Sequence, residues 1–224
     1  MHKLATGVHR FHREVFAEQR QLFETLARGQ TPQALFLTCS DSRMDPNLVT
    51  QSKPGDLFIV RNAGNLVPAW NGLASVSGET AAIEFAIEGL GIEHIVVCGH
   101  SGCGAIKALL APEPPRSMPA LGAWLEHAAP TRRIVETCYG HRDEEARVNV
   151  AIQENVLQQI ASLQTHPCIA ARIAAGKVHL YAWVFKISTG EMFAFDAGAG
   201  QFLPLAEVAA QPPPRGALRD ALVG

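Results

Sequence analysis

The chain has 224 residues, of which 47% are hydrophobic and 18% charged, and its formal net charge is −2. A chain of this length buries roughly 70–75% of its unfolded surface, so it can build a core without disulfides or structural metals. The apolar content excludes a disordered or collagen-like chain, and the nearly balanced charge argues against a nucleic-acid-binding protein. Acidic and basic residues are interspersed, so no membrane-binding patch stands out.

Targeting signals and cysteine usage point to a reducing compartment. Residues 1–7 lack the apolar core of a signal peptide, and no apolar run reaches the ~18–20 residues of a membrane span. We therefore expect a cytoplasmic protein. Its cysteines are odd in number and scattered, which favours free thiols, metal ligands or nucleophiles over disulfide bonds. They are Cys39, Cys98, Cys103, Cys138 and Cys168.

The first predicted element is a helix over about residues 8–28, where hydrophobic residues recur at helical spacing and Gly29 follows as a stop signal. Three short runs that are apolar on both faces are typical of parallel strands covered by helices. These runs are 34–38, 57–60 and 95–98.

The rest of the chain continues this alternation of strands and helices. Helices are predicted over 79–88 and near 145–163. The runs 178–185 and 191–195 flank a Ser-Thr-Gly turn at 188–190, which predicts a hairpin. The stretch 112–119 is rich in proline and predicts a loop. The pattern indicates a single α/β domain whose parallel sheet carries an antiparallel edge.

Two of the predicted strands end in residues that bind metals. Cys39 ends the first, and the third runs into a Gly-rich turn with His100 and Cys103 before a helix. Open parallel sheets place their sites beyond the carboxyl ends of the strands, so we expect these side chains to meet. Two thiolates and an imidazole are good zinc ligands, and three protein ligands leave the fourth tetrahedral position open, as in a catalytic site.

Asp41 and Arg43 follow Cys39 closely. A guanidinium can keep a carboxylate ionised through its charge and its hydrogen bonds. The carboxylate could then accept the proton of a zinc-bound hydroxide and orient its lone pair, or it could bind zinc itself and close the site, with Arg43 as the gate. The simpler interpretation is a surface ion pair worth at most ~1 kcal/mol.

The segments Cys39-Ser40-Asp41-Ser42-Arg43 and His100-Ser101-Gly102-Cys103-Gly104 together resemble the signature pair of the β-class carbonic anhydrases. The resemblance covers about residues 5–205. It extends through Arg61-Asn62-Ala63-Gly64-Asn65, 81–86 and 181–183.

Residues 45–50 and 118–119 resemble the cyanobacterial and carboxysomal branch in particular. That branch commonly carries a long C-terminal extension, whereas this sequence stops soon after Pro214. The difference weakens the case for association with the carboxysome.

The resemblance implies a zinc ion held by Cys39, His100 and Cys103, with Asp41 and Arg43 as a catalytic dyad and Asp41 on zinc only in a closed form. The implied reaction is the reversible hydration of CO2 to bicarbonate and a proton, with a zinc-bound hydroxide as nucleophile oriented by the dyad. Because two thiolates cancel the formal charge of the metal, we expect its water to be less acidic than at a three-histidine site. Activity should therefore rise on the alkaline side of neutrality.

The resemblance also implies a four-stranded parallel core sheet with an antiparallel edge strand, flanked by helices, and an obligate homodimer that can assemble into a tetramer or a larger oligomer. Residues 1–30 would form an N-terminal helical arm that packs on the partner subunit. Residues 31–205 would form the zinc-binding α/β catalytic domain and 206–224 a C-terminal tail, within one domain overall. Neither nucleic acid nor a membrane is expected as a partner.

Members of the family build a narrow substrate pocket with residues from the dimer interface. By position, these residues correspond to Gln30, Phe58 and Phe85, with the backbone of Gly104. Phe85 stands where relatives often have tyrosine, so a phenol hydroxyl is absent. The apolar walls suit a small nonpolar gas.

A subset of the family also binds bicarbonate at a non-catalytic site, through a tryptophan and a tyrosine. The corresponding places here hold Phe36 and Phe185, so no such site is expected. Arg61 corresponds to a further residue of that site, and we interpret it as a structural arginine bonded to nearby carbonyls.

Three alternatives stay open. The same scaffold could hydrolyse COS or CS2. Cys103 or Cys39 could act as a nucleophile, although Gly99-His100-Ser101-Gly102-Cys103 departs from the G-x-S-x-G elbow in its fifth residue. The chain could also be a non-catalytic, zinc-stabilised assembly protein. We interpret Cys98 as a small core residue and His94 and His179 as residues with local structural roles.

Overall fold

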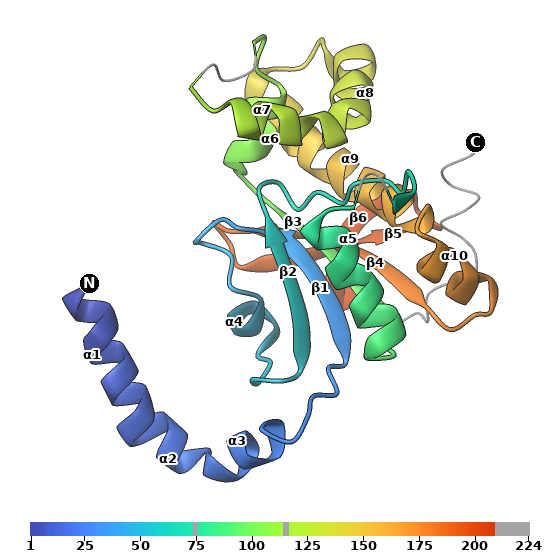
Figure 1. Cartoon of the computed structure of the whole chain (residues 1–224). Helices are drawn as coiled ribbons and strands as arrows, with labels where there is room; N and C mark the ends of the chain where they lie inside the picture. Colours follow the sequence, from blue (N-terminus) through green and yellow to red (C-terminus); the bar gives the residue numbers. More distant parts are fainter. Residues whose placement is uncertain (74–75, 114–116, 209–224) are drawn as a thin grey trace.

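The computed structural model describes residues 1–73, 76–113 and 117–208. Six strands form one sheet in the order β2-β1-β3-β4-β5-β6 (Figure 1). Four of them pair in parallel: β1 (Ala34–Cys39), β2 (Leu57–Asn62), β3 (His94–His100) and β4 (His179–Lys186). Two pair antiparallel at one side: β5 (Glu191–Asp196) and β6 (Gln201–Pro204). The predicted mixed α/β sheet is confirmed.

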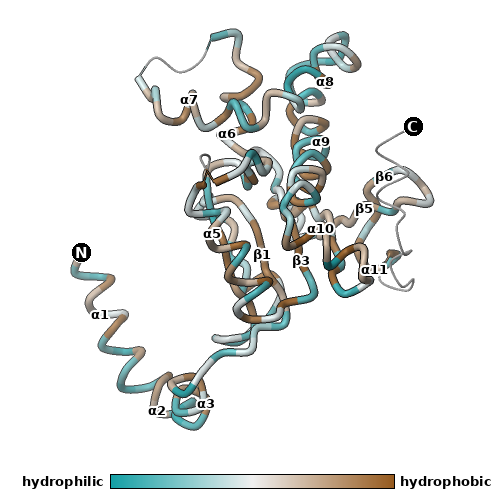
Figure 2. The backbone as a smooth tube through the Cα atoms, turned by 45° about the vertical axis from the view of Figure 1, so that its right-hand side comes forward, coloured by the Kyte–Doolittle hydropathy of each residue, from teal (hydrophilic) through white to brown (hydrophobic). Residues whose placement is uncertain are grey.

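Successive side chains of a strand lie on opposite faces of the sheet and pack into two different core clusters. In β1, Leu35 and Leu37 join the larger core cluster, whereas Phe36 between them joins a second one, because successive side chains of a strand point to opposite faces. The larger cluster also contains residues of α5 (Gly78–Glu84), α9 (Glu144–Gln164) and α10 (Pro167–Ala174), so these helices cover one face of the sheet. On the other face lies α4 (Pro46–Thr50). Figure 2 shows hydrophobic colour along β1 and β3.

The long helix α9 has clear start signals in the sequence. The side chain of Asp143 caps it by accepting a hydrogen bond from the backbone N–H of Ala146 at 2.8 Å, and Glu144 and Glu145 occupy its first turn, where acidic side chains favour the helix dipole. The helix predicted near 145–163 is thus confirmed. The helix predicted over 79–88 begins one residue earlier as α5 and continues through a wider, π-helical turn at Phe85–Gly89.

Besides α4, four further α-helices and one strand among the described residues were not predicted. α7 (Pro119–Leu125) begins at the end of the proline-rich stretch, because proline is compatible with the first turn of a helix. Residues 114–116 of that stretch lie outside the described residues. α8 (Ala129–Tyr139) and α10 also begin with proline in their first turn, and β6 is too short to show a pattern. Of the expected tail, 209–224 lies outside the described residues; the preceding Leu205–Val208 forms α11.

The N-terminal arm differs in detail from the single helix predicted over 8–28. It begins earlier, as α1 (His2–Arg10), and continues through a π-helical turn (Phe11–Val15), α2 (Phe16–Glu18) and α3 (Arg20–Leu26). Gln19, at φ −107° and ψ 21°, interrupts the helix. No residue of these elements is buried, and Figure 1 shows the arm extending away from the sheet. The remaining helix, α6 (Gly104–Leu109), follows β3 directly.

Candidate metal centre

The carboxyl ends of β1 and β3 bring the three predicted metal ligands together. β1 ends with Cys39 and its neighbour β3 ends with His100. The chain then turns sharply through Gly102, whose φ of +66° is easily reached by glycine, and Cys103 becomes the N-terminal cap of α6. The expectation from the strand ends is therefore met: residues far apart in the sequence share one edge of the sheet.

The three side chains are close enough to share one ion. The Sγ atoms of Cys39 and Cys103 lie 3.8 Å apart, and the ligand atoms of these two residues and His100 all lie within 4.8 Å of one another. Their exposed fractions are 5%, 1% and 0%. Among the described residues, this is the group of His, Cys, Asp and Glu that can hold a metal ion.

The hydrogen bonding of His100 leaves one ring nitrogen ready for a metal. Nδ1 lies 3.1 Å from the carbonyl oxygen of Ser101 and donates its proton to it, which leaves Nε2 with a free lone pair. Nε2 is fully buried and has no hydrogen-bond partner. A buried imidazole nitrogen without a partner is costly unless it binds something, so the donor set fits a metal ion. Two thiolates and one imidazole suit zinc.

Cys39 is the member of the cysteine pair that loses its proton first, whereas the hydrogen bond to Cys39 and burial raise the pKa of Cys103. The thiol of Cys103 donates toward Cys39, and this hydrogen bond lowers the pKa of Cys39, aided by His100 and by the backbone N–H of Gly64 at 3.4 Å from its Sγ. The thiolate is the form that binds a metal.

Asp41 and Arg43 form a two-pronged ion pair beside the ligands. Nε of Arg43 donates to Oδ1 of Asp41 at 2.9 Å and Nη2 donates to Oδ2 at 2.7 Å, while the backbone N–H of Arg43 donates to Oδ1 at 3.0 Å. These bonds hold the pKa of the Asp41 carboxyl well below its usual range. Oδ2 of Asp41 lies 3.8 Å from Nε2 of His100, so an ionised carboxylate borders the candidate metal position.

Arg43 also ties this pair to the turn between the ligands. Its Nη2 donates to the carbonyl oxygen of Gly102 at 3.2 Å. Arg61 has a different role: it donates to the carbonyl oxygens of Cys39, Asp41 and Met44 at 2.8–3.0 Å. The prediction that Arg61 is a structural arginine is confirmed.

The predicted substrate residues divide into two groups. Gly104 follows Cys103 at the start of α6, next to the ligands. Phe58 pairs with Leu35 near the opposite end of the sheet, and the ring of Phe85 lies 6.0 Å from that of Phe58. Gln30 is exposed before β1 begins, in a groove with Leu26 and Gly55. Gln30, Phe58 and Phe85 do not join the metal cluster within one chain.

The other side chains singled out in the sequence have local roles. Phe36 and Phe185 are buried in the second core cluster, where the ring of Phe36 lies 6.2 Å from that of Trp183. Cys98 is a fully buried core residue, and its burial raises the pKa of its thiol. The rings of His94 and His179 stack at 5.4 Å.

One part of the centre was not predicted from the sequence. The buried amides of Asn155 and Gln159 on α9 bond to the loop that carries Gly64, which faces Cys39. A signal for them was present in the sequence: two amide side chains one turn apart lie on the mostly apolar inner face of a predicted helix. Such a pattern indicates a buried polar network.

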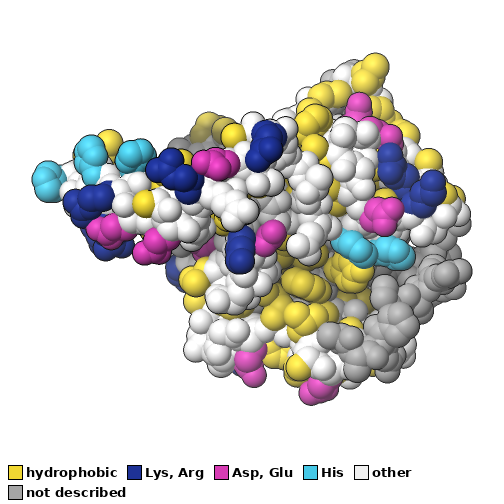
Figure 3. Space-filling view, turned by 90° about the horizontal axis from the view of Figure 1, so that it is seen from below, with side chains coloured by type: hydrophobic (Ala, Val, Ile, Leu, Met, Phe, Trp, Pro, Cys, Tyr) yellow, Lys and Arg dark blue, Asp and Glu magenta, His cyan; other side chains and the backbone are white. Residues whose placement is uncertain are grey.

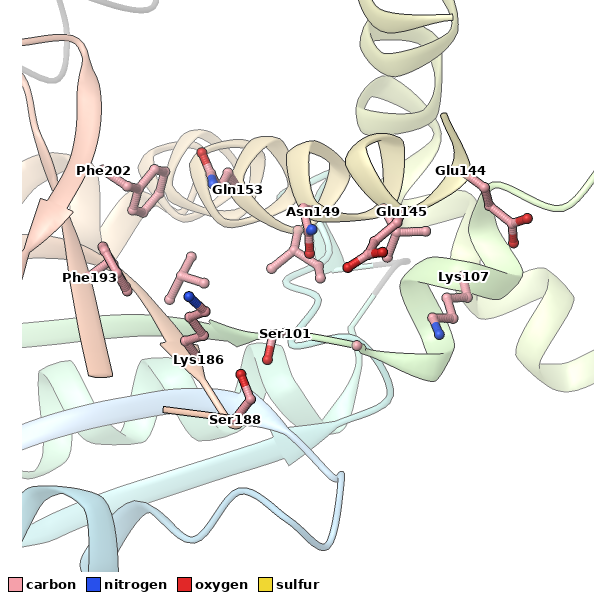
Figure 4. Close-up of a pocket in the computed structure, with 14 residues that line it drawn as sticks. Ser101, Lys107, Glu144, Glu145, Asn149, Gln153, Lys186, Ser188, Phe193 and Phe202 are labelled. Carbon is pink, nitrogen blue, oxygen red and sulfur yellow. The ribbon is translucent and has the colours of Figure 1, made fainter. Parts of the chain in front are cut away.

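A cleft of about 790 Å³ lies behind the turn at Ser101 and Gly102. Figure 4 shows side chains of α9, including Glu145 and Asn149, on one side of it and Lys186 and Ser188 on the other. None of the three predicted ligands lines this cleft. It is therefore distinct from the candidate metal centre.

Comparisons with known proteins agree with this geometry. The family model described as carbonic anhydrase matches residues 34–192. A carbonic anhydrase of Synechococcus elongatus is 46% identical over 86% of this chain and 70% of its own length, and one of Pseudomonas aeruginosa is 41% identical over 92% and 93%. Among solved structures, the β-carbonic anhydrase CcaA is 44% identical with a TM-score of 0.87, covering 91% of this chain and 98% of its own. One of two tetrameric β-carbonic anhydrases of Sordaria macrospora is 30% identical with a TM-score of 0.78, covering 87% and 95%.

Proposed function

The chain belongs to the carbonic anhydrase family, and on that premise we propose that it catalyses the reversible hydration of CO2 on a zinc ion held by Cys39, His100 and Cys103. The observation that carries the proposal is the buried Cys-His-Cys cluster bordered by a carboxylate that an arginine keeps ionised. A zinc ion bound there would supply an acidified water, so that hydroxide becomes available as a nucleophile near neutral pH.

Asp41 orients the nucleophile. An ionised carboxylate can only accept hydrogen bonds, so Asp41 would accept a hydrogen bond from the attacking group and thereby fix the direction of its lone pair. Arg43 keeps Asp41 in this role, because two hydrogen bonds from its guanidinium occupy both carboxylate oxygens. We propose that the site is in its open form, with Asp41 paired with Arg43 rather than used as a fourth ligand; the two hydrogen bonds between them support this.

The pocket that admits CO2 is proposed to form between two subunits. Gly104 stands next to the ligands, whereas Gln30, Phe58 and Phe85 lie toward the other end of the sheet. We assign these three to the pocket of a partner subunit, which makes the enzyme an obligate homodimer. The tetrameric relative supports further assembly of such dimers.

The location of the enzyme stays a prediction. Among the described residues, no helix combines the length and apolar character that crossing a bilayer requires. A cytoplasmic location is our expectation, and carboxysomal association is the alternative that fractionation would detect.

The decisive experiment combines metal analysis with CO2-hydration kinetics by stopped flow. We expect about one zinc per chain and a rate that rises between pH 6 and 9. A flat profile over this range, or full activity of the metal-free protein, would contradict the proposal. Assays with COS and CS2 on the same preparation test the hydrolase alternative, which predicts faster turnover of these gases than of CO2. Treatment of the zinc-loaded enzyme with an alkylating agent tests the nucleophilic-cysteine alternative, which predicts loss of activity.

A further inference from the structure

A buried polar network joins α9 to the loop after β2. Asn155 and Gln159 are 1% and 0% exposed, and they stand one helical turn apart on the face of α9 that packs on the sheet. Nε2 of Gln159 donates to Oδ1 of Asn155 at 2.9 Å. This bond orients both amides, because it fixes which atom of each side chain is the donor and which the acceptor.

The remaining amide atoms bond to the backbone of the loop. Nδ2 of Asn155 donates to the carbonyl oxygen of Gly64 at 3.0 Å, and Oε1 of Gln159 accepts from the backbone N–H of Val67 at 2.8 Å. From another side, Nε1 of Trp124 on α7 donates to the carbonyl oxygen of Ala63 at 2.9 Å. The loop is thus held at three points by side chains distant in sequence.

The loop presents a single backbone N–H to the metal centre. The N–H of Gly64 points to Sγ of Cys39 at 3.4 Å. Gly64 has a φ of +84°, and a Cβ built on it would lie 3.3 Å from Cβ of Ala105, so both its conformation and its close contact with α6 favour glycine. The peptide unit that carries this N–H is held by Trp124 through the carbonyl oxygen of Ala63, and the following unit is held by Asn155 through the carbonyl oxygen of Gly64. A rotation of the loop that turned the N–H from the sulfur would strain or break these bonds.

We propose that Asn155 and Gln159 are positioning residues of the metal centre: through the loop at Gly64 they aim a backbone hydrogen bond at the sulfur of the ligand Cys39. The inference rests on the proposed metal site. A hydrogen bond to a ligating thiolate withdraws charge from the sulfur and fixes the orientation of the side chain, as outer partners of metal ligands do. An apolar pair at these two positions would fill the same space, but it could not orient the loop.

The hydrogen bond itself can be tested on the unaltered protein loaded with cadmium-113. Cadmium replaces zinc at thiolate sites and gives an NMR signal. We expect the amide proton of Gly64 to show a scalar coupling to cadmium across the N–H···S bond. A loaded protein whose Gly64 amide shows no coupling would overturn the proposal.

The positioning role is tested with Asn155→Leu and Gln159→Met, which keep approximate volume and remove the polar atoms. In the cobalt-loaded proteins we expect the sulfur-to-metal charge-transfer band to move to longer wavelength, because the sulfur loses its hydrogen bond. We also expect zinc to be bound 10–100-fold more weakly in a chelator competition. The matched control is Ile160→Val, a fully buried residue of the same helix, which should leave both readings unchanged.

If both variants lose stability like the control and keep the wild-type band and zinc affinity, the network is purely structural and the proposal is wrong. Should Asn155→Leu fail to fold, Gln159→Glu takes its place: its carboxyl can keep the bond to Val67, so it should restore the wild-type band that Gln159→Met loses. None of these readings depends on turnover. A protein that shows the coupling and the band shift without hydrating CO2 would refute the proposed function and leave this inference standing.

Discussion

The predicted site residues at the two ends of the parallel sheet differ in how far a single chain buries them. At the carboxyl end, Cys39, His100 and Cys103 are buried and lie together within one subunit, with only Nε2 of His100 left without a hydrogen-bond partner among their buried side-chain nitrogen and oxygen atoms. At the amino end, Phe85 is 51% exposed and Gln30 lies open to solvent. The difference supports our proposal that one chain supplies the metal site by itself, whereas the substrate pocket is completed by a second chain.

The N-terminal arm adds further exposed apolar side chains to those at the amino end of the sheet. Leu4 and Val8 of α1 are 68% and 67% exposed, and Phe11 and Val15 follow at helical spacing with 41% and 37%. Figure 3 shows hydrophobic side chains gathered at the surface of the body next to the arm. An apolar stripe that its own chain leaves uncovered is the surface that a partner subunit would bury.

The largest effect is expected when one predicted ligand is removed from the candidate metal centre at the carboxyl end of the sheet. Cys39→Ala should abolish stoichiometric zinc and reduce CO2 hydration to the background rate, because two ligands do not hold a catalytic zinc. Metal analysis and stopped-flow kinetics check both. Cys138→Ala, at an exposed cysteine, is the control and should behave as wild type. A zinc-loaded, active Cys39→Ala protein would remove this residue from the site.

A smaller effect is expected from Asp41→Asn. The amide no longer forms the ionised pair with Arg43, and it offers an NH2 donor in place of one acceptor oxygen, so kcat should fall by about 10²–10⁴. Zinc content should stay at the wild-type level, since Asp41 is paired with Arg43 and not with the cysteine cluster. Loss of zinc together with activity would assign Asp41 to the metal instead.

The arm is tested by a charge on its apolar stripe. Val8→Asp should shift the dimer to monomer in sedimentation experiments and lower activity by at least about tenfold, while each chain keeps its zinc. The expected size reflects a buried, unpaired charge at an interface, which costs several kcal/mol. Thr6→Asp adds the same charge on the other side of α1 and serves as control. A fully active monomer would show that one chain completes the pocket by itself.

The smallest effect concerns the pH dependence of folding. His166 is 2% exposed, its Nε2 lies 2.9 Å from the carbonyl oxygen of Pro68, and burial lowers the pKa of its ring. The unfolded chain therefore binds a proton below about pH 6.5 that the folded chain does not, so the free energy of unfolding falls as the pH decreases from about 7.

His166→Gln places an uncharged amide near the same carbonyl. Chemical denaturation should show a shallower loss of stability between pH 7 and 5 than in wild type, with no difference in slope above pH 7. An unchanged slope in the acid range would mean that His166 does not contribute to it.

Much of the body could be predicted because its signals are local. The apolar runs of β1 and β3 indicated buried parallel strands, and strand ends in a parallel sheet meet at one edge, so Cys39 could be placed with His100 and Cys103. The arm was predicted less well. Its helix begins at His2 and is interrupted at Gln19, and no periodic signal marks that break.

The sequence could indicate a buried polar network on α9 but not its partners, because nothing local links Asn155 to Gly64, which lies 91 positions earlier. The same holds for Trp124, whose indole N–H donates a hydrogen bond to the carbonyl oxygen of Ala63, 61 positions earlier. Such contacts depend on how helices are docked on the sheet.

The amino-acid sequence by itself determined the α/β alternation, the three candidate metal ligands and the Asp41–Arg43 pair, since each follows from periodicity, ligand chemistry or short spacing. Tertiary structure alone decided which nitrogen of His100 is left free, which backbone N–H faces Cys39, and that Phe58 and Phe85 lie away from the ligands. The physical reason is that hydrogen bonds and burial are properties of groups brought together by packing, and a sequence records the groups without their neighbours.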